Sequence, residues 1–405
     1  MQLVERHVIK EGHPHYQEID NLCWLSKNLY NYANYLVRQS FIHENTYLNY
    51  LAIQKQLQGT EVYKALPSKV SQQVLMGLEK NWQSFFAAMA EWKENPKKFL
   101  GRPSLPKYKD KEKGRNLLTY TSQAISKVAL KKGFVKLSKS DVVVKTKISD
   151  VNQVRVIPKL DHYVVEVVYE VEVSPQQRDA YRIASIDIGL DNLAAVTFNQ
   201  AGIKPLLING KPLKSINQYF NKRKAEMQSK LGKGSSKQLK KLCSKRNFKV
   251  DDYLHKASRL IVDTLDANQI GTLVIGKNEN WKQEINIGRQ NNQNFVQVPH
   301  ARFIQMLKYK AELLGIYVIE QEESYTSQAS FLDLDLIPVY SSESKTNYMF
   351  SGRRVKRGIY KSRSGKQFNA DVNGSYNIMR KAIPTAFGNG IEGVVVHPVR
   401  LTPAK

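Results

Sequence analysis

The chain has 405 residues, of which 41% are hydrophobic, and this length is enough for two or three domains with cores of their own. Lysine and arginine outnumber aspartate and glutamate by 62 to 36, which gives a formal net charge of +26. The composition excludes a disordered chain, and no run of about 18 apolar residues predicts a membrane span. Nucleic acid is therefore the expected partner, because a strongly basic chain attracts polyanions, and no membrane partner is expected.

The two cysteines, Cys23 and Cys243, lie far apart in unrelated contexts. They exclude a disulfide framework and a cysteine-based metal site. The N-terminal residues MQLVERHVIKEGH lack the apolar core of a signal peptide. We therefore expect a cytoplasmic, nucleoid-associated protein.

Two long amphipathic helices are predicted near the N-terminus. Apolar residues recur at steps of three and four over residues 19–36 and again over 70–92, as a one-sided helix requires. They indicate a helical domain over residues 14–99.

Residues 92–115 then contain nine lysines or arginines, three acids and three prolines, which is typical either of a surface that follows a nucleic-acid backbone or of a solvated linker. Its candidate contacts are Arg102, Lys107 and Lys109.

Residues 119–173 change to a period of two, which predicts β-strands. Turn signals at Lys132-Gly133 and at Leu160–His162 divide them into two hairpins. Together with an N-terminal strand, these hairpins predict a small antiparallel β-barrel over residues 1–13 and 100–178, into which the helical domain is inserted.

The second half of the chain has a different element order. Three strands come first, followed by helix, strand, helix and strand, which is the order of an RNase H-like fold. In that fold the first, fourth and fifth strands run parallel, and ligands gather where their C-terminal ends meet. The expected fold class is therefore α+β and multidomain, with the barrel and its inserted helices followed by an RNase H-like α/β domain. The strands are expected near 183–208, 272–276 and 316–321, and the helices near 212–268 and 299–314.

Two acids stand at informative places. Asp187 follows a short apolar run within IASIDIGLDNLAAV (Ile183–Val196), where a strand gives way to a turn. A carboxylate there destabilises the fold unless it is hydrogen-bonded or binds a cation, although an Asp can also simply cap a turn. Asp371 lies at the start of a predicted helix, and Asn373 and Asn377 share one face of that helix.

Two segments are strongly basic. Residues 211–249 hold thirteen lysines or arginines and one acid, with a break at LGKGSS (Leu231–Ser236) between two helices. Such a segment repels itself without a polyanion, so it is either a solvated face or a lid that binds nucleic acid. Residues 353–366 add seven basic residues and no acid. The candidate contacts are Lys222, Arg223, Lys240, Lys241, Lys245, Arg246, Arg353, Arg354, Lys356 and Arg357.

Three motifs, in this order, resemble the TnpB (OrfB) family. IDIGLDNLAAV (Ile186–Val196), SYTSQAS (Ser324–Ser330) and ADVNGSYNIMRKA (Ala370–Ala382) are similar to its first RuvC motif, the entry to its zinc ribbon and its third RuvC motif. TnpB proteins are transposon-encoded RNA-guided nucleases related to the type V CRISPR effectors. The resemblance covers nearly the whole chain.

The resemblance implies an RNA-guided DNA endonuclease. Such a protein binds a transposon-derived guide RNA, recognises a short motif beside its target and cleaves double-stranded DNA with carboxylates that hold two Mg²⁺ ions. The implied partners are one guide RNA for each protein monomer and a double-stranded DNA target. A RuvC-like domain would span residues 179–323 and 370–385, a degenerate zinc-ribbon-like insertion 324–369 and a tail 386–405.

Two departures from the family pattern matter, and the first concerns zinc. Family members carry two CxxC pairs around the insertion, whereas residues 324–369 of this chain contain neither Cys nor His. We therefore expect no zinc. Strand pairing of Val339–Tyr340 and Tyr348–Phe350 would hold the segment together instead.

The second departure is the middle catalytic glutamate. Alignment on the fourth strand places Gly276 at its position, so another glutamate would have to supply the third ligand beside Asp187 and Asp371. The candidates are Glu323, Glu322 and Glu279. The fifth strand lies about 4.8 Å from the fourth, and alternation turns only one of residues 322 and 323 inward. We expect Glu323, because it directly precedes the Ser-Tyr-Thr turn where the chain leaves the sheet. The alternative is a set of exposed acids on an edge strand.

Two other functions stay open. If the middle carboxylate is absent, the chain could be a nuclease-inactive, RNA-guided DNA-binding repressor. A guide-free, structure-specific nuclease of the resolvase type is the third possibility. Asp187 and Asp371 favour a nuclease, because a non-catalytic protein has little reason to keep two costly buried acids.

Overall fold

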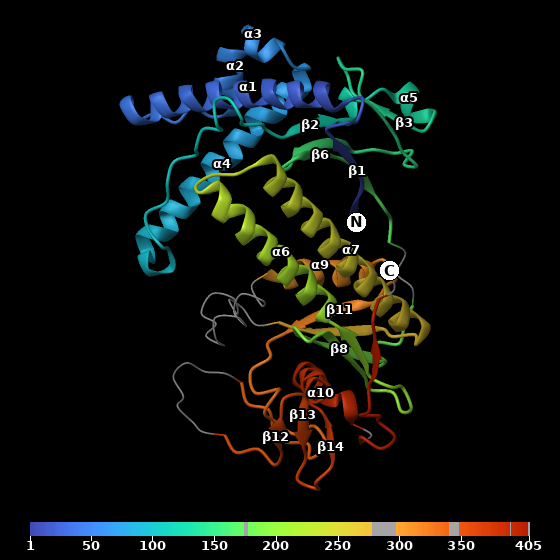
Figure 1. Cartoon of the computed structure of the whole chain (residues 1–405). Coiled ribbons are helices and arrows are strands. Elements are labelled where there is room, and N and C mark those ends of the chain that lie inside the picture. Colours follow the sequence, from blue (N-terminus) through green and yellow to red (C-terminus); the bar gives the residue numbers. More distant parts are fainter. Residues whose placement is uncertain (174–176, 278–296, 340–347, 389, 404–405) are drawn as a thin grey trace. The chain divides into compact units, whose positions relative to one another are not determined.

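The computed structural model describes residues 1–173, 177–277, 297–339, 348–388 and 390–403 (Figure 1). The chain forms two compact units, Met1–Glu172 and Val173–Lys405. Among the described residues, none of the helices has the length and apolar character needed to cross a bilayer. The finer domain boundaries expected from the sequence stay predictions.

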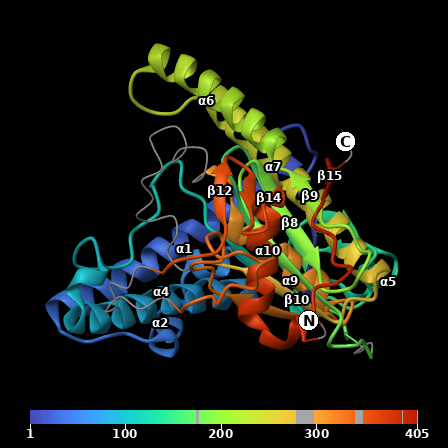
Figure 2. The same ribbon diagram turned by 90° about the horizontal axis from the view of Figure 1, so that it is seen from below.

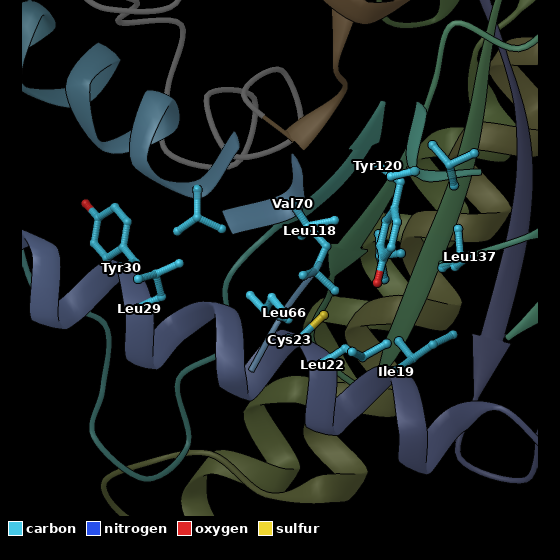
Figure 3. Packing of buried hydrophobic residues seen from close by; sticks show 14 of the residues in the cluster. Ile19, Leu22, Cys23, Leu29, Tyr30, Leu66, Val70, Leu118, Tyr120 and Leu137 are labelled. Atoms are coloured by element: carbon cyan, nitrogen blue, oxygen red, sulfur yellow. The ribbon is translucent and has the colours of Figure 1, made fainter. Parts of the chain in front are cut away.

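The first unit is built on two long helices that the apolar spacing predicted, α1 (Tyr16–His43) and α4 (Ser68–Glu94). Short helices α2 (Tyr50–Leu57) and α3 (Glu61–Lys64) connect them, and a 3-10 turn, η1 (Pro96–Lys98), follows α4. Aromatic side chains hold α1 and α4 together: the Trp82 ring lies 5.3 Å from that of Phe41. Figure 3 shows the core nearby, where the buried Cys23 lies among aliphatic side chains.

The β-strands of this unit form an open sheet rather than a barrel. Four strands pair antiparallel in the order β1-β6-β5-β2, so β1 and β2 are its two edges, and the expected closed barrel is wrong. Strands β3 and β4 form a separate ribbon. The turn predicted between β5 and β6 is confirmed. The strands are β1 (Gln2–Lys10), β2 (Leu118–Thr121), β3 (Phe134–Lys136), β4 (Val143–Lys145), β5 (Gln153–Pro158) and β6 (His162–Glu170).

One predicted strand is a helix. Before the Lys132-Gly133 turn the chain forms α5 (Lys127–Lys131), preceded by a 3-10 turn, η2 (Ser122–Ala124). The Ser126 side chain accepts a hydrogen bond from the Ala129 N–H, which caps the first turn of a helix. This local cap favours a helix more strongly than the alternation of apolar and polar residues, which spans only a few positions, favours a strand.

The second unit contains a six-stranded sheet in the order β11-β10-β7-β8-β9-β15. Strands β7, β10 and β11 run parallel and β8 is antiparallel to β7, as the element order predicted. The C-terminal β15 pairs parallel with β9, a strand that the sequence pattern did not reveal. The strands are β7 (Ile183–Ile188), β8 (Asn192–Phe198), β9 (Leu206–Asn209), β10 (Thr272–Gly276), β11 (Tyr317–Gln321) and β15 (Val399–Leu401).

Helices cover both faces of this sheet (Figures 1 and 2). Helices α7 and α9 share one apolar core with residues such as Ile186, whereas α10 packs on the opposite face with residues such as Ala195. Asp187 therefore belongs to the face that carries α10. The helices are α6 (Lys211–Leu231), α7 (Lys237–Ala267), α9 (His300–Glu312), α10 (Ala370–Ala382) and the 3-10 turn η3 (Pro384–Phe387).

The insertion between β11 and α10 carries a small antiparallel sheet of β12 (Arg353–Lys356), β13 (Ile359–Lys361) and β14 (Gln367–Asn369). The strand predicted at Tyr348–Phe350 is wrong, since those residues lie outside any strand. Of the other predicted strand, Tyr340 lies outside the described residues. The pairing strands are short and largely polar, and β12 is mostly basic, so an apolar pattern did not reveal them.

Candidate active site

Asp187 lies at the C-terminal end of β7, opposite Ala195 of β8. Its carboxylate reaches the second turn of α10, where Gly374 leaves room for it. A Cβ at residue 374 would lie 2.6 Å from Asp187 Oδ2, so a helix with any larger residue there would have to move away.

A buried group of hydroxyls fixes α10 against the sheet at this point. Ser185 Oγ lies 2.7 Å from Thr197 Oγ1 and donates to the Ser375 carbonyl at 2.7 Å, while Ser375 Oγ donates to the Ser185 carbonyl at 3.0 Å. Because all three side chains are fully buried, these bonds fix the position of the helix relative to β7. Sequence reasoning missed this group, although its signal was small polar residues within apolar strands.

Asp371 begins α10, as predicted. The Asn369 side chain accepts hydrogen bonds from the backbone N–H groups of Asp371 and Val372, which caps the helix. Asn192 Nδ2 donates to Asp371 Oδ2 at 2.7 Å, and the Arg354 guanidinium lies 3.6 Å from Oδ1. Asn192 was not predicted as a site residue, yet it orients the carboxylate.

Glu323 fills the space beside Gly276. This glycine stands at the position where the family pattern expects the middle catalytic glutamate. A Cβ at residue 276 would lie 3.0 Å from the Glu323 carboxyl carbon and 2.6 Å from Ile378 Cδ1. The side chain comes from the second residue after β11 and occupies the volume that a larger residue on β10 would need. Of the pair 322 and 323, Glu323 is therefore the one that points toward β10, as expected; its role as a ligand stays a prediction.

Glu322, the second candidate glutamate, is engaged in other contacts. Glu322 accepts a hydrogen bond from Lys381 Nζ at 2.6 Å and another from Ser324 Oγ at 2.8 Å. Burial would raise its pKa, but these partners hold the pKa below its usual value. Glu279 lies outside the described residues.

The three carboxylates share one electrostatic environment. Burial and then the Asp371 charge raise the pKa of Asp187 to about 7, with Arg354 opposing the shift. Burial and then the Asp187 charge raise the pKa of Glu323 to about 9. Asp187 thus interacts with both of the other acids, and it is the residue around which they are arranged.

This donor set fits a hard divalent cation. All its ligands are oxygens, and a cation would reverse the repulsion that raises the two pKa values. Within the described ranges, no three or more His, Cys, Asp or Glu side chains are arranged so that they could hold a metal ion.

Comparisons with known proteins show similarity to TnpB-like and Cas12f1-like proteins. The family model OrfB_IS605, described as a probable transposase, matches residues 166–282, and that of the Cas12f1-like TNB domain matches residues 300–378. The TnpB-like protein ORF457 of Acidianus two-tailed virus is 25% identical over 95% of this chain and 85% of its own. The resemblance to TnpB (OrfB) is confirmed.

Two further relatives of this TnpB-like chain can be described. The CRISPR-associated endodeoxyribonuclease Cas12f1 of Sulfoacidibacillus thermotolerans is 28% identical over 54% of this chain and 50% of its own length. The solved Cas12f1–sgRNA–target DNA complex is 16% identical and covers 94% of this chain and 100% of its own, with a TM-score of 0.37. The mini RNA-guided endonuclease Cas_phi3 is 10% identical over 98% and 94%, with a TM-score of 0.43.

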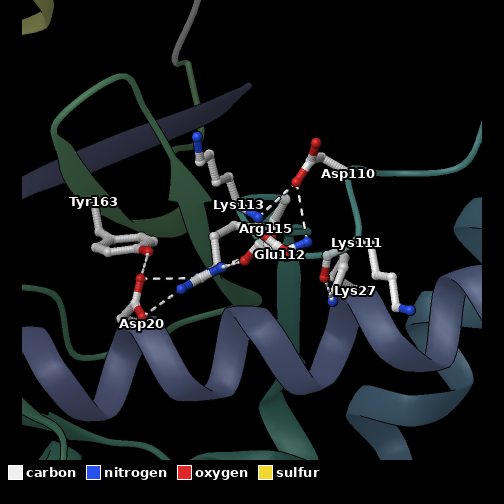
Figure 4. Close-up of polar contacts among 9 residues, drawn as sticks. Asp20, Lys27, Asp110, Lys111, Glu112, Lys113, Arg115 and Tyr163 are labelled. Carbon is white, nitrogen blue, oxygen red and sulfur yellow. Dashed lines mark hydrogen bonds and ion pairs between the residues drawn. The ribbon is translucent and has the colours of Figure 1, made fainter. Parts of the chain in front are cut away.

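The basic segment after α4 is tied along α1 by hydrogen bonds (Figure 4). Asn34 Nδ2 donates to the Pro106 carbonyl at 2.9 Å, Asn31 pairs with both backbone groups of Lys109 at 2.8 and 2.9 Å, and Lys27 Nζ donates to the Lys111 carbonyl at 2.6 Å. Arg115 pairs with Asp20 through two bonds, at 2.8 and 2.7 Å. The partners on α1 recur at steps of three, four and seven residues, so a single helix face holds the segment.

This arrangement bears on the predicted contacts Arg102, Lys107 and Lys109. Lys107 and Lys109 lie in the stretch that is tied to α1, residues 106–115, which we call the strap, whereas Arg102 precedes it. The Lys109 ammonium lies 5.3 Å from the Tyr30 ring centroid. A fixed backbone reduces the ordering entropy that binding would cost. Contact with nucleic acid by these three residues stays a prediction.

The predicted contacts of the second unit fall into two groups. Lys222, Arg223, Lys240, Lys241, Lys245 and Arg246 lie on α6 and α7, where Arg223 pairs with Glu226 at 2.6 Å. Arg353, Arg354 and Lys356 lie on β12, and Arg357 follows that strand. Arg357 pairs at 2.5 Å with Asp191, which also binds Lys214.

Asparagines of α10 hold the entry of the insertion. Asn373 Oδ1 accepts from the Phe331 N–H at 2.9 Å, and Asn377 Nδ2 donates to the carbonyls of Thr326 and Ala329. Asp335 Oδ2 accepts from the N–H groups of residues 330 and 351, which links two distant parts of the insertion. Polar cross-links of this kind connect the parts of a segment that contains no Cys or His.

Proposed function

We propose that this chain is an RNA-guided DNA endonuclease with a RuvC-like centre formed by Asp187, Glu323 and Asp371. The observation that supports it best is the position of Glu323, whose carboxylate enters beside Gly276 and interacts with Asp187. An acid that follows β11 would thereby stand in for the one missing from β10. Two-ion chemistry on a phosphodiester needs carboxylates that converge on the ions, and Asp187 interacts with each of the other two acids.

Two Mg²⁺ ions, when bound, would activate a water molecule and stabilise the leaving oxygen. The protein's own residues would prepare the site for this. Asn192 donates to Oδ2 of Asp371 and does not engage Oδ1. Arg354, 3.6 Å from Oδ1, would donate to a DNA phosphate instead when substrate binds.

Guide RNA would supply sequence selection. Base pairing between guide and target needs only a protein that holds the phosphate backbone, and a net charge of +26 serves that purpose without base readout. Recognition of a short motif beside the target belongs to the same proposal.

The test is magnesium-dependent cleavage of a matched double-stranded target by protein purified with its RNA. Variants Asp187→Ala, Asp371→Ala and Glu323→Gln should bind RNA and target but lose cleavage, because only metal binding is removed. Glu322→Gln is the matched control, since that side chain pairs with Lys381. Normal cutting by Glu323→Gln together with loss of cutting by Glu279→Gln would reject the assignment of Glu323.

A nuclease-inactive RNA-guided DNA-binding repressor is the second candidate. It is favoured by the glycine at residue 276 and by the lack, in the described ranges, of a group of three or more acids or other ligands arranged around an ion. In that case the wild-type protein would bind the guide and the target but leave the DNA intact, even at Mg²⁺ concentrations at which related nucleases cleave DNA.

A further inference from the structure

Helices α6 and α7 enclose a pocket that the proposed catalytic site does not use. Its volume is about 290 Å³. The residues that matter for its chemistry are Ile216, Tyr219 and Phe220 from α6 and Lys245, Arg246 and Lys249 from α7. They recur at steps of one, three and four residues, so each helix contributes one face.

The lining combines aromatic rings with positive charge. Tyr219 is 61% exposed, which leaves its ring open to a ligand, and the Arg246 guanidinium lies 5.7 Å from the Phe220 ring centroid. No acidic residue of the described ranges lines the pocket. The pocket therefore suits a ligand that is planar and anionic.

One wall is fixed before any ligand binds. Arg246 Nε donates to Asn217 Oδ1 at 2.8 Å, and its terminal nitrogen donates to the Gln297 carbonyl at 2.7 Å. The Gln297 side chain in turn exchanges two hydrogen bonds with Asn221, at 3.1 and 2.9 Å. Lys245 and Lys249 are exposed at the rim, where they can reach a phosphate.

The pocket begins at the same edge of the sheet as the carboxylates. Asn209, the last residue of β9, pairs with Asn192 beside the end of β7, and α6 starts two residues later. Lys214 in the first turn of α6 binds Asp191 of that edge. Tyr219 follows Lys214 by five residues, which is roughly 8 Å along a helix axis.

We propose that this pocket receives one unstacked base of the single-stranded DNA that passes the catalytic carboxylates. The base would stack on Tyr219, and Lys245 and Lys249 would bind the phosphates on either side. The pocket lies at the small end of the roughly 300–1,000 Å³ typical of ligand sites, which suits a single base but not a base pair. The inference rests on the proposed function, because that function places a DNA strand at this edge.

Binding of a short fluorescein-labelled oligothymidylate to the full chain in magnesium-free buffer tests the pocket. Tyr219→Ala should weaken binding at least about fivefold, because stacking is lost, whereas Tyr219→Phe should keep wild-type affinity. Lys245→Gln with Lys249→Gln should lower the dependence of affinity on salt by about two phosphate contacts. Lys230→Gln with Lys233→Gln, two exposed lysines outside the pocket, is the charge-matched control.

Photocrosslinking with an iododeoxyuridine-substituted strand gives a second readout that needs no variant. The expected result is a crosslinked peptide containing Tyr219 by mass spectrometry. Unchanged binding by Tyr219→Ala, crosslinks confined to other segments, or tighter binding of the same sequence as RNA or duplex would each overturn the proposal. If the pocket variants behave as expected but wild type never cuts a matched target, the nuclease proposal fails and the pocket stands.

Discussion

The carboxyl group of Glu323, two residues after β11, occupies the space where a side chain on Gly276 of β10 would begin. A Cβ at residue 276 would lie 3.0 Å from the Glu323 carboxyl carbon. A glutamate at 276 and one at 323 therefore exclude each other, and the absence of the first makes room for the second.

The first prediction concerns transfer of the carboxylate from residue 323 to residue 276. Glu323→Ala should abolish DNA cleavage, and Gly276→Glu in the same chain should restore part of it, because the new side chain enters the emptied volume from the adjacent strand. Gly276→Glu alone should be inactive and less stable by about 1–3 kcal/mol through overpacking. Cleavage rates and chemical denaturation of the three variants check this. An active Gly276→Glu single variant would contradict the shared-volume argument.

Gly374→Ala should damage the site through Asp187. The added methyl group would lie 2.6 Å from Asp187 Oδ2, so either the carboxylate or α10 must move, and cleavage should fall at least about tenfold, as expected for a misplacement of the order of 1 Å. Gly77→Ala is the control. That residue is exposed within α4 with no atom within 4 Å of an added Cβ, so alanine there should stabilise the protein by roughly 0.5–1 kcal/mol. Equal cleavage by both variants would show that Gly374 has no role in positioning.

Lys310 should make stability depend on pH in the alkaline range. Its Nζ donates to the His255 carbonyl at 2.8 Å and to Ser258 Oγ at 2.7 Å, and burial lowers its pKa to about 8. The unfolded chain, with an ordinary lysine pKa, binds more protons between pH 8 and about 10.4, so folding stability should rise with pH across that window.

The comparison that isolates this effect is Lys310→Met, which cannot titrate. The difference in unfolding free energy between wild type and variant should change in favour of wild type by up to about 3 kcal/mol from pH 8 to 10. Urea denaturation at a series of pH values measures it. A difference that stays constant across the window would mean that Lys310 keeps an ordinary pKa.

Asn34 should matter more than its neighbour Asn31 for holding residues 106–115 on α1. Asn34 is fully buried, donates to the Pro106 carbonyl and accepts from Trp82 Nε1 at 3.1 Å. Asn34→Leu leaves the buried Trp82 N–H without this partner, whereas the Pro106 carbonyl keeps a hydrogen bond from Arg38 at 3.2 Å. We expect a loss of about 1–3 kcal/mol for the indole and about 1 kcal/mol more for the lost bond to Pro106. Asn31→Ala, at an exposed pair of bonds, should cost less than about 1.5 kcal/mol for each bond. A larger effect from Asn31 than from Asn34 would reverse the assignment.

No zinc should accompany the purified protein. Residues 324–369 contain no Cys or His, and Asp335 instead accepts N–H groups from Ser330 and Ser351. Elemental analysis should give less than one zinc per chain, and Asp335→Ala should increase proteolysis within the insertion because a cross-link is lost. Asp179→Ala, in an exposed turn outside the insertion, is the control. Stoichiometric zinc would refute this prediction.

The sequence by itself determined the elements that depend on neighbours along the chain. The apolar spacing of α1 and α4, the break between α6 and α7, and the strand–helix order from β7 to β11 are local patterns, and each was predicted from residue periodicity. Asp187 at a strand end and Asp371 at a helix start carry local signals of the same kind. Alternation, once β10 and β11 were assumed to pair, reduced the choice for the third acid to one of Glu322 and Glu323, and the turn after Glu323 favoured that residue.

Tertiary structure alone decided what depends on residues far apart in sequence. Whether the first sheet closes is set by its edge strands β1 and β2, and the place of β15 is set by β9, so periodicity within one strand could not reveal either. Asn192 reaches Asp371 across 179 positions, and Gly276 makes room for Glu323. Such contacts exist only after packing, because a side chain's charge and position at a site depend on what surrounds it.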